Sequence, residues 1–302
     1  MWQSEALPAQ PAAHPAGGGA PLLLIVGFCL SWSSAFAVGK IGLQDCPPLL
    51  LLTVRFLIAG GLLVAFTAWR GEYRDMSART FAVLALLGLL NNTLYLGLSY
   101  SGMTLVSSGF TAIVISINPV LVAAAATLFL GERMSLRRGA GLMLGLIGVA
   151  LVVRGRLGGG SDDPFGMLLI FGALVALATG TLLFKRLAPQ AGVLANTGIQ
   201  TLVAGLALLP AALLLEDPGA IRLTGSLLGA LAFLVLVTSI GAYVLWFLLL
   251  QRTSATEASA YHFLMPPLGL LFGWVLLGEA VQPWDLLGIL PVAVGIRLVT
   301  KG

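Results

Sequence analysis

Residues 128–135 read LFLGERMS and residues 275–282 read VLLGEAVQ, so an apolar run stops at the same Gly-Glu pair twice, 147 positions apart. Glycine readily adopts the left-handed conformation that ends a helix. Each stretch therefore predicts the end of an apolar helix, with the Glu beginning a tight turn into the next helix. Arginines follow the first copy only, which indicates that the two equivalent turns face different environments.

Apolar residues dominate the whole chain. Of its 302 residues, 58% are hydrophobic and 9% are charged, whereas average soluble domains carry about 25% charged residues. Stretches long enough to cross roughly 30 Å of hydrocarbon recur from Pro21 onward. We therefore expect an all-α integral membrane protein with ten transmembrane helices and the lipid bilayer as a partner. The expected helices span residues 21–42, 48–69, 80–101, 104–130, 137–154, 166–187, 193–215, 226–250, 254–277 and 284–300.

Charge and cysteine content exclude several classes. The net charge of +4 comes from arginines in short loops and predicts no nucleic-acid partner. Cys29 and Cys46 form neither a disulfide framework nor a metal site, and no cofactor is expected. Residues 1–20 are rich in Pro, Ala and Gly and lack the basic start of a signal peptide. They are expected to form a disordered cytoplasmic tail before a retained first helix.

The distribution of Lys and Arg predicts the orientation in the membrane. If the N-terminus is cytoplasmic, eleven of these residues lie inside and four outside, which satisfies the positive-inside rule. Both termini are therefore expected in the cytoplasm. The inner group comprises Arg70, Arg74, Arg79, Arg133, Arg137, Arg138, Lys185, Arg186, Arg252, Arg297 and Lys301, and the outer group comprises Lys40, Arg154, Arg156 and Arg222.

The Gly-Glu turns belong to a longer internal repeat. Five helices are an odd number, so the second copy must cross the bilayer upside down. Inverted repeats are typical of transporters that expose a central site alternately to the two sides. We expect repeats over 21–154 and 166–302, joined by a linker over 155–165. The matched pairs are Pro119 with Pro266, Gly141 with Gly288 and Gly148 with Gly295 at an offset of 147, and Lys40 with Lys185 and Arg55 with Gln200 at an offset of 145.

These features resemble the drug/metabolite transporter superfamily and its EamA-type branch. The resemblance rests on the two five-helix repeats, on a Pro…LGE turn before a Gly-rich helix in each, and on LSWSSAF at 30–36. Within the superfamily the chain resembles bacterial amino-acid exporters in overall likeness rather than in one diagnostic motif. The resemblance implies a multi-pass transporter of the bacterial inner membrane with a central substrate path.

Polar and aromatic residues inside the expected helices mark that path, because polar groups in hydrocarbon usually face a cavity or the bundle interior. His262 is expected to bind substrate, carry a proton or pack as a neutral residue. Either Asn91 or Asn92 is expected to face the path. Pro119 and Pro266 are the expected hinges. The predicted substrate-binding residues are Trp32, Ser34, Asn91, Tyr95, Asn118, Thr179, Ser239, Tyr243, Trp246 and His262.

Few charges lie within reach of the bilayer. Arg55 is about 10 Å deep in its helix and is expected to pair with an outer-side carbonyl or with Asp45. Glu257 is expected to pair with Arg252, one turn away. Lys40 is expected to snorkel from a helix end toward the membrane surface.

A neutral, hydroxyl- and amide-bearing lining suits a small neutral or zwitterionic molecule. We therefore expect a monomeric transporter, not an enzyme, that exports neutral or aromatic amino acids and related metabolites by facilitated diffusion. The alternative is a proton-coupled exporter of drugs or of other neutral metabolites such as sugars. Paired carboxylates, a nucleophile beside a base or a metal cluster would be needed for an enzyme, and the expected spans contain almost no acids.

Overall fold

The computed structural model describes residues 20–106, 111, 114–153, 163–278 and 283–301, and every regular element in these ranges is helical. The expected tail and linker lie outside the described residues, apart from residue 20 and residues 163–165. The first half contains α1 (Leu22–Leu43), α2 (Pro48–Trp69), α3 (Ala78–Gly88), η1 (Leu89–Leu94), α4 (Tyr95–Gly102), α6 (Asn118–Phe129) and α7 (Leu136–Val153). The second half contains α8 (Pro164–Leu187), α9 (Val193–Leu215), η3 (Pro218–Ala220), α10 (Gly225–Phe233), η4 (Leu234–Ala242), α11 (Tyr243–Arg252), α12 (Ala255–Ala260), η5 (Tyr261–Leu264), α13 (Met265–Leu277), η6 (Pro283–Gly288) and α14 (Ile289–Thr300).

Seven helical stretches among the described residues are long and apolar enough to cross a membrane. Val114–Phe129 and Leu286–Thr300 are apolar but shorter, and α7 ends where the described residues end. The count of ten transmembrane helices therefore stays a prediction. The seven stretches are Leu22–Leu43, Pro48–Trp69, Ala78–Gly102, Pro164–Leu187, Val193–Leu215, Gly225–Arg252 and Ala255–Leu277.

Several of the expected helices are not α-helical throughout: 284–300 begins in the 3₁₀ segment η6, and a turn at Ile117 interrupts 104–130. The expected helix 80–101 contains the π-helical segment η1, and 226–250 contains the π-helical segment η4. These two segments begin 145 residues apart. The same offset relates Lys40 to Lys185 and Arg55 to Gln200 in the earlier part of each repeat. Short π segments inside helices are frequent at functional sites. Within 254–277, the 3₁₀ turn η5 separates α12 from α13.

Both Gly-Glu turns begin with the predicted backbone conformation. Gly131 has φ +69° and Gly278 has φ +66°, each directly after an apolar helix. The N–H of Glu132 donates to the carbonyl of Ala126 at 3.2 Å and closes the first turn. The Glu132 side chain has a further role that the sequence pattern did not predict. Its carboxylate accepts hydrogen bonds at the start of α12, from Ala255 N at 2.8 Å and Thr256 Oγ1 at 2.5 Å.

The two halves meet through an approximate two-fold axis. A Cβ on Gly141 would lie 2.7 Å from the carbonyl oxygen of Gly295, and one on Gly148 would lie 2.8 Å from that of Gly288. At the repeat offset of 147, Gly288 is the counterpart of Gly141 and Gly295 that of Gly148. Gly141 thus faces the counterpart of Gly148, and Gly148 faces the counterpart of Gly141. This reciprocal pairing is the signature of a two-fold contact. The pairing also shows that α7 and α14 run antiparallel.

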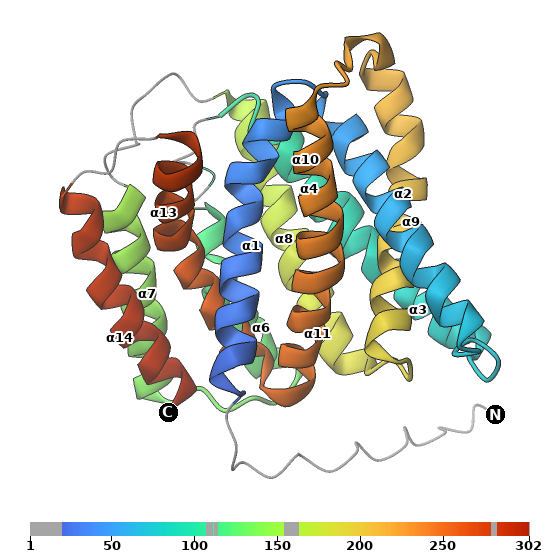
Figure 1. The fold of residues 1–302 in the computed structure, drawn as a ribbon. Coiled ribbons are helices and arrows are strands. Elements are labelled where there is room, and N and C mark those ends of the chain that lie inside the picture. The colour runs from blue at the N-terminus through green and yellow to red at the C-terminus, as the bar shows by residue number, and fades with distance from the viewer. Residues whose placement is uncertain (1–19, 107–110, 112–113, 154–162, 279–282, 302) are drawn as a thin grey trace.

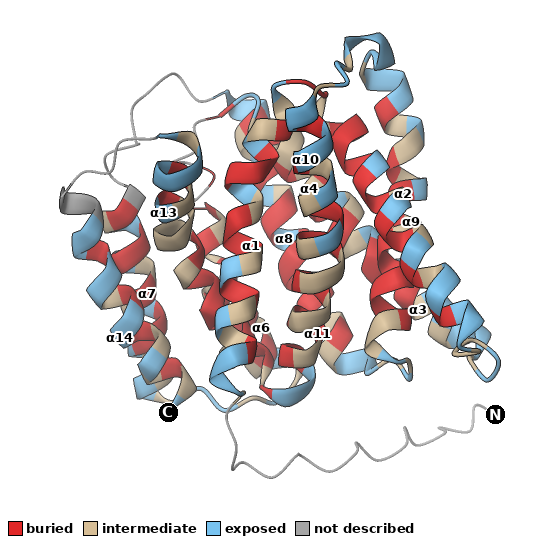
Figure 2. Ribbon diagram, viewed as in Figure 1, coloured by how far each residue is buried: buried red, intermediate tan, exposed pale blue. Residues whose placement is uncertain are grey.

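The pair α2 and α9 repeats this arrangement at the offset of 145. Gly60 lies against Leu202, and its counterpart Gly205 lies against Leu57. Figure 1 shows α7 beside α14 on one flank and α2 beside α9 on the other. It also shows that α1 begins and α14 ends at the same face of the bundle. Exposed residues gather on the outward faces of such outer helices and buried residues on the faces turned inward (Figure 2).

Candidate functional site

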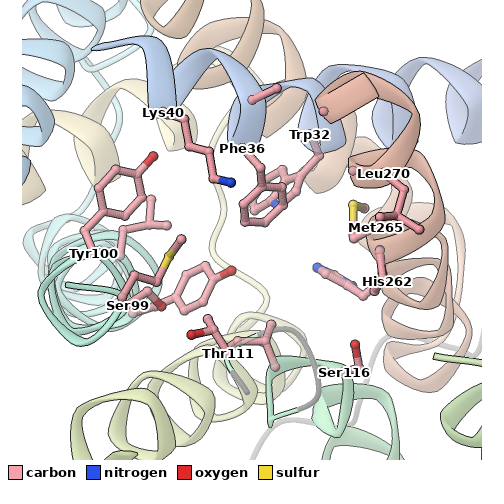
Figure 3. Close-up of a pocket in the computed structure, with 18 of the residues that line it drawn as sticks. Trp32, Phe36, Lys40, Ser99, Tyr100, Thr111, Ser116, His262, Met265 and Leu270 are labelled. Carbon is pink, nitrogen blue, oxygen red and sulfur yellow. The ribbon is translucent and has the colours of Figure 1, made fainter. Parts of the chain in front are cut away.

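A cavity lies between the two halves of the chain, bounded by α1, α4, the segment before α6, and η5 with α13 (Figure 3). The space open to the centres of water-sized spheres is about 170 Å³. The cavity reaches from Met265 to Leu277, which is about 18 Å of α13 at 1.5 Å per residue. It is lined by Trp32, Phe36, Ala37, Lys40, Tyr95, Leu96, Ser99, Tyr100, Met103, Thr111, Ile115, Ser116, His262, Met265, Pro266, Gly269, Leu270, Gly273 and Leu277.

Two interrupted helices shape this region. A turn at Ile117 precedes α6, and the 3₁₀ turn η5 precedes α13; Pro119 and Pro266 are each the second residue of the helix that follows. Proline has no N–H to continue a preceding helix but fits the first turn of a new one. Both predicted hinges thus lie where a helix restarts. Pro266 lines the cavity, whereas Pro119 is buried outside its lining.

Aromatic rings close one end of the cavity. Trp32 lies 5.1 Å from Tyr243 and 5.4 Å from Phe28 between ring centroids, and Phe28 stacks on Trp246 at 5.3 Å. The ring of His262 meets that of Trp246 edge-on at 4.9 Å. Such offset and edge-to-face pairs add roughly 0.5–1.5 kcal/mol each beyond the area that they bury. We call Phe28, Trp32, Tyr243, Trp246 and His262 the aromatic cluster.

His262 has one nitrogen bonded and the other unpartnered. Nδ1 lies 3.1 Å from the carbonyl oxygen of Ser259, while Nε2 has no hydrogen-bond partner among the described residues. The side chain is only 4% exposed. An unpaired buried polar atom costs about 1–3 kcal/mol, so this nitrogen is a candidate ligand contact.

Four of the residues predicted from the sequence lie together on the wall of the cavity: Trp32, Tyr95, His262 and Pro266. Tyr243 and Trp246 lie behind Trp32 in the aromatic cluster rather than on the wall.

The other predicted residues have different surroundings. Ser34 Oγ donates to the carbonyl of Ser31 at 3.1 Å. Asn91 donates to Gln200 Oε1 at 3.4 Å and lies against α8, while Asn92 is buried outside the lining. Asn118 is also buried outside the lining, and its amide has no partner among the described residues. Thr179 is half-buried on α8, and Ser239 bonds to Arg55.

Several wall residues were not predicted as binding residues. Phe36 and Lys40 follow Trp32 at intervals of four on α1, and Ser99 follows Tyr95 at the same interval on α4. Residues four apart share one face of a helix. Extending the periodicity from Trp32 and Tyr95 would therefore have found them.

Arg55 has a different partner from the one expected. Its side chain is 2% exposed, and Nε donates to Ser239 Oγ in η4 at 2.6 Å. A similar contact joins Asn91 in η1 to Gln200, which is the counterpart of Arg55 in the second repeat. The second helix of each repeat, α2 or α9, thus forms a hydrogen bond with the π-helical segment of the other repeat.

Asp45 instead pairs with Arg222 at 2.9 Å. The hydrogen bond from Thr224, followed by that from Ser226 and the charge of Arg222, lowers the pKa of the Asp45 carboxyl despite its partial desolvation. The expected pair of Glu257 with Arg252 is also wrong, because Glu257 pairs with Arg138 at 3.2 Å.

The end of the bundle beyond the aromatic cluster is joined by polar contacts between helices. Lys185, at the end of α8, donates to the carbonyl of Thr253, and Glu132 bonds the start of α12. With the pair Arg138–Glu257, these contacts tie α7, α8 and the turn after α6 to α12. The described residues contain no group of three His, Cys, Asp or Glu side chains that could hold a metal ion.

Comparison with known proteins agrees with this architecture. The pattern of the EamA-like transporter family matches residues 19–154 and 164–301, one copy in each half. The chain is 29% identical to the uncharacterized transporter YvbV of Bacillus subtilis (strain 168), over 92% of this chain and 90% of that protein. It is 31% identical to the uncharacterized inner membrane transporter YedA of Escherichia coli (strain K12), over 90% and 87%.

A solved crystal structure shares the fold with a TM-score of 0.78 at 20% identity, over 92% of this chain and 96% of that one. Seven apolar spans, a two-fold pair of repeats and a central cavity thus accompany the two family matches. The chain is a multi-pass membrane transporter that belongs to the EamA-like transporter family.

Proposed function

We propose that this transporter exports small neutral or aromatic amino acids and related metabolites across a bacterial inner membrane by facilitated diffusion. The proposed topology is ten helices in two inverted five-helix repeats, with both termini cytoplasmic. The observation that carries the cargo class is the wall of the cavity. Among the described lining residues it combines aromatic rings and hydroxyl groups with Lys40 and His262, and it contains no carboxylate.

This wall favours a zwitterion over the other cargo classes. Among the described lining residues, a cationic drug would meet Lys40 and no carboxylate. A sugar phosphate would call for several cations to match its charge, and Lys40 is the only Lys or Arg of the described lining. An amino acid offers a carboxylate to Lys40 and an ammonium to hydroxyl oxygens and aromatic faces. Its apolar side chain suits the remaining wall.

The two ends of the cavity support alternating access. Lys40, near the end of α1, is exposed, so the cavity reaches the face where α1 and α13 end. The aromatic cluster and the contacts of Lys185 and Glu132 lie toward the opposite face. With cytoplasmic termini, this is a state open to the outside and closed to the cytoplasm. Because the repeats are related by a pseudo-two-fold axis, they can also adopt the reverse state, which is open to the cytoplasm and closed to the outside.

The alternative, a proton-coupled exporter of drugs or of neutral metabolites such as sugars, is favoured by one observation. Nε2 of His262 has no partner among the described residues and can accept a proton.

One experiment separates the two functions. Proteoliposomes containing the protein and unlabelled amino acids should take up labelled amino acids by exchange, at a rate that an imposed pH gradient does not change. A rate that follows the pH gradient would support the alternative. Absence of exchange with every amino acid, by protein that remains folded, would overturn the proposed cargo class; sugars and cationic drugs would then be tested in the same vesicles.

A further inference from the structure

The inference rests on the proposed function and concerns how the cavity selects among amino acids. A backbone carbonyl only accepts hydrogen bonds, so the contact with Ser259 places the proton of the neutral imidazole on Nδ1 of His262. Nε2 then carries a lone pair and is an acceptor. Figure 3 shows the ring of His262 extending from η5 toward the open space, with a nitrogen at its tip.

The surroundings of this acceptor are apolar and aromatic. The rings of Trp32, Phe28 and Trp246 lie 6.1, 5.8 and 4.9 Å from the imidazole between centroids. Bringing a full zwitterion to this end would strip both of its charges of water, which is costly without paired charges. A flat aromatic ring with one polar hydrogen meets no such penalty, because the ring packs on Trp32 and the hydrogen reaches Nε2.

The opposite end suits the charged head group. Lys40 lies two helical turns beyond Trp32 on the same face of α1 and is exposed. Figure 3 shows its amino group on the side of the cavity across from His262. Tyr100 lies on the same side of the cavity (Figure 3), and its hydroxyl oxygen would be 3.0 Å from a Cβ on Gly39. A carboxylate can therefore bind the Lys40 ammonium while remaining hydrated.

The His262 end and the Lys40 end of the cavity are far enough apart to contact different parts of the cargo. Trp32 and Lys40 are eight residues apart, which is about 12 Å along the helix, and the lysine stem leans back toward the N-terminus of the helix. The rise along α1 exceeds the span of an α-amino acid head group, so the two ends of the cavity contact different parts of one cargo molecule. We infer that Nε2 of His262 accepts the indole N–H of tryptophan or the phenol O–H of tyrosine, while Lys40 binds the α-carboxylate.

Competition against labelled tryptophan on the purified full-length protein tests the buried contact. Tryptophan should bind about tenfold more tightly than 1-methyltryptophan, which lacks the N–H, because a buried acceptor without a donor costs about 1–3 kcal/mol. Tyrosine should exceed phenylalanine by a similar factor. His262→Phe should bring both ratios to about one, and His262→Gln, which retains an acceptor, should restore part of them. If His262 had only a structural role, its substitution would weaken the binding of all ligands equally and leave the affinity ratios unchanged.

The head-group contact is tested with tryptophanamide, which keeps the indole and loses the carboxylate. The wild type should prefer tryptophan over the amide, and Lys40→Gln should remove this preference while keeping the ratio of tryptophan to 1-methyltryptophan. Equal binding of tryptophan and 1-methyltryptophan by a wild type that does bind amino acids would overturn the inference and leave the proposed function standing. If the wild type binds no amino acid, the result overturns the proposed function, on which this inference rests.

Discussion

Gly60→Ala should lower the free energy of unfolding by about 3 kcal/mol or more, the upper end of the cost of overpacking. A Cβ at Gly60 would lie 2.5 Å from the Cα of Leu202 and 2.8 Å from its Cβ, so α2 and α9 must move apart. The opposing atoms are backbone, and no flexible side chain can yield. Helix propensity alone predicts the opposite sign, because alanine favours a helix over glycine by about 1 kcal/mol.

The neighbouring glycine is the matched control. A Cβ at Gly61 meets nothing within 4 Å, so Gly61→Ala should be neutral or slightly stabilising. Gly205→Ala should reproduce the loss, because its Cβ would lie 2.8 Å from Leu57 N in the two-fold counterpart of the same contact. Thermal unfolding in one detergent measures all three. Equal Tm values for Gly60→Ala and Gly61→Ala would refute the close α2–α9 contact.

Trp32→Ala should reduce amino-acid exchange in proteoliposomes by at least about tenfold. Trp32 lines the cavity and contacts all four other members of the aromatic cluster. Removing it deletes the ring on which the cargo packs and opens a path toward the closed end. Truncating a buried Trp also costs roughly 3–5 kcal/mol of stability, so the rate must be measured on protein shown to be folded, and Trp32→Phe should keep a larger share of the activity.

Trp69 is the control of the same residue type, because it ends α2 with 81% of its surface exposed and is remote from the lining. Trp69→Ala should leave the exchange rate unchanged. Normal exchange by folded Trp32→Ala would mean that the cargo takes another route.

Local features of the sequence predicted much of the fold. The bounds of α2 and α9 match the expected ranges 48–69 and 193–215, because each is a predominantly apolar run with Pro or Gly just before it and a charged residue just after it. The left-handed glycines at 131 and 278 follow from the special conformational freedom of glycine. The repeat offset identified Gly141, Gly148, Gly288 and Gly295 as matched positions, but it did not predict that Gly141 meets Gly295 or that Gly148 meets Gly288.

Contacts between distant segments could not be predicted in this way. Arg55 meets Ser239 across 184 residues and Glu132 meets Ala255 across 123, and no local pattern encodes such pairs. The polar residues that bridge helices, such as Asn91, look the same in sequence as those that line a cavity. A polar group in a membrane helix needs a partner, but whether that partner is protein or cargo depends on the packing.

The most direct test of the account uses a cysteine at Gly269, a lining residue whose added Cβ would meet nothing within 4 Å. Cys29 and Cys46 are first replaced by Ser, and Gly61→Cys in the same background serves as the control outside the lining. The rate of modification by a membrane-impermeant thiol reagent is then measured from each side of the membrane. Gly269→Cys should react from the outside and tryptophan should slow this reaction, while Gly61→Cys should show no such protection. Absence of reaction from the outside, or a rate that no amino acid changes, would contradict a cargo cavity open to that side.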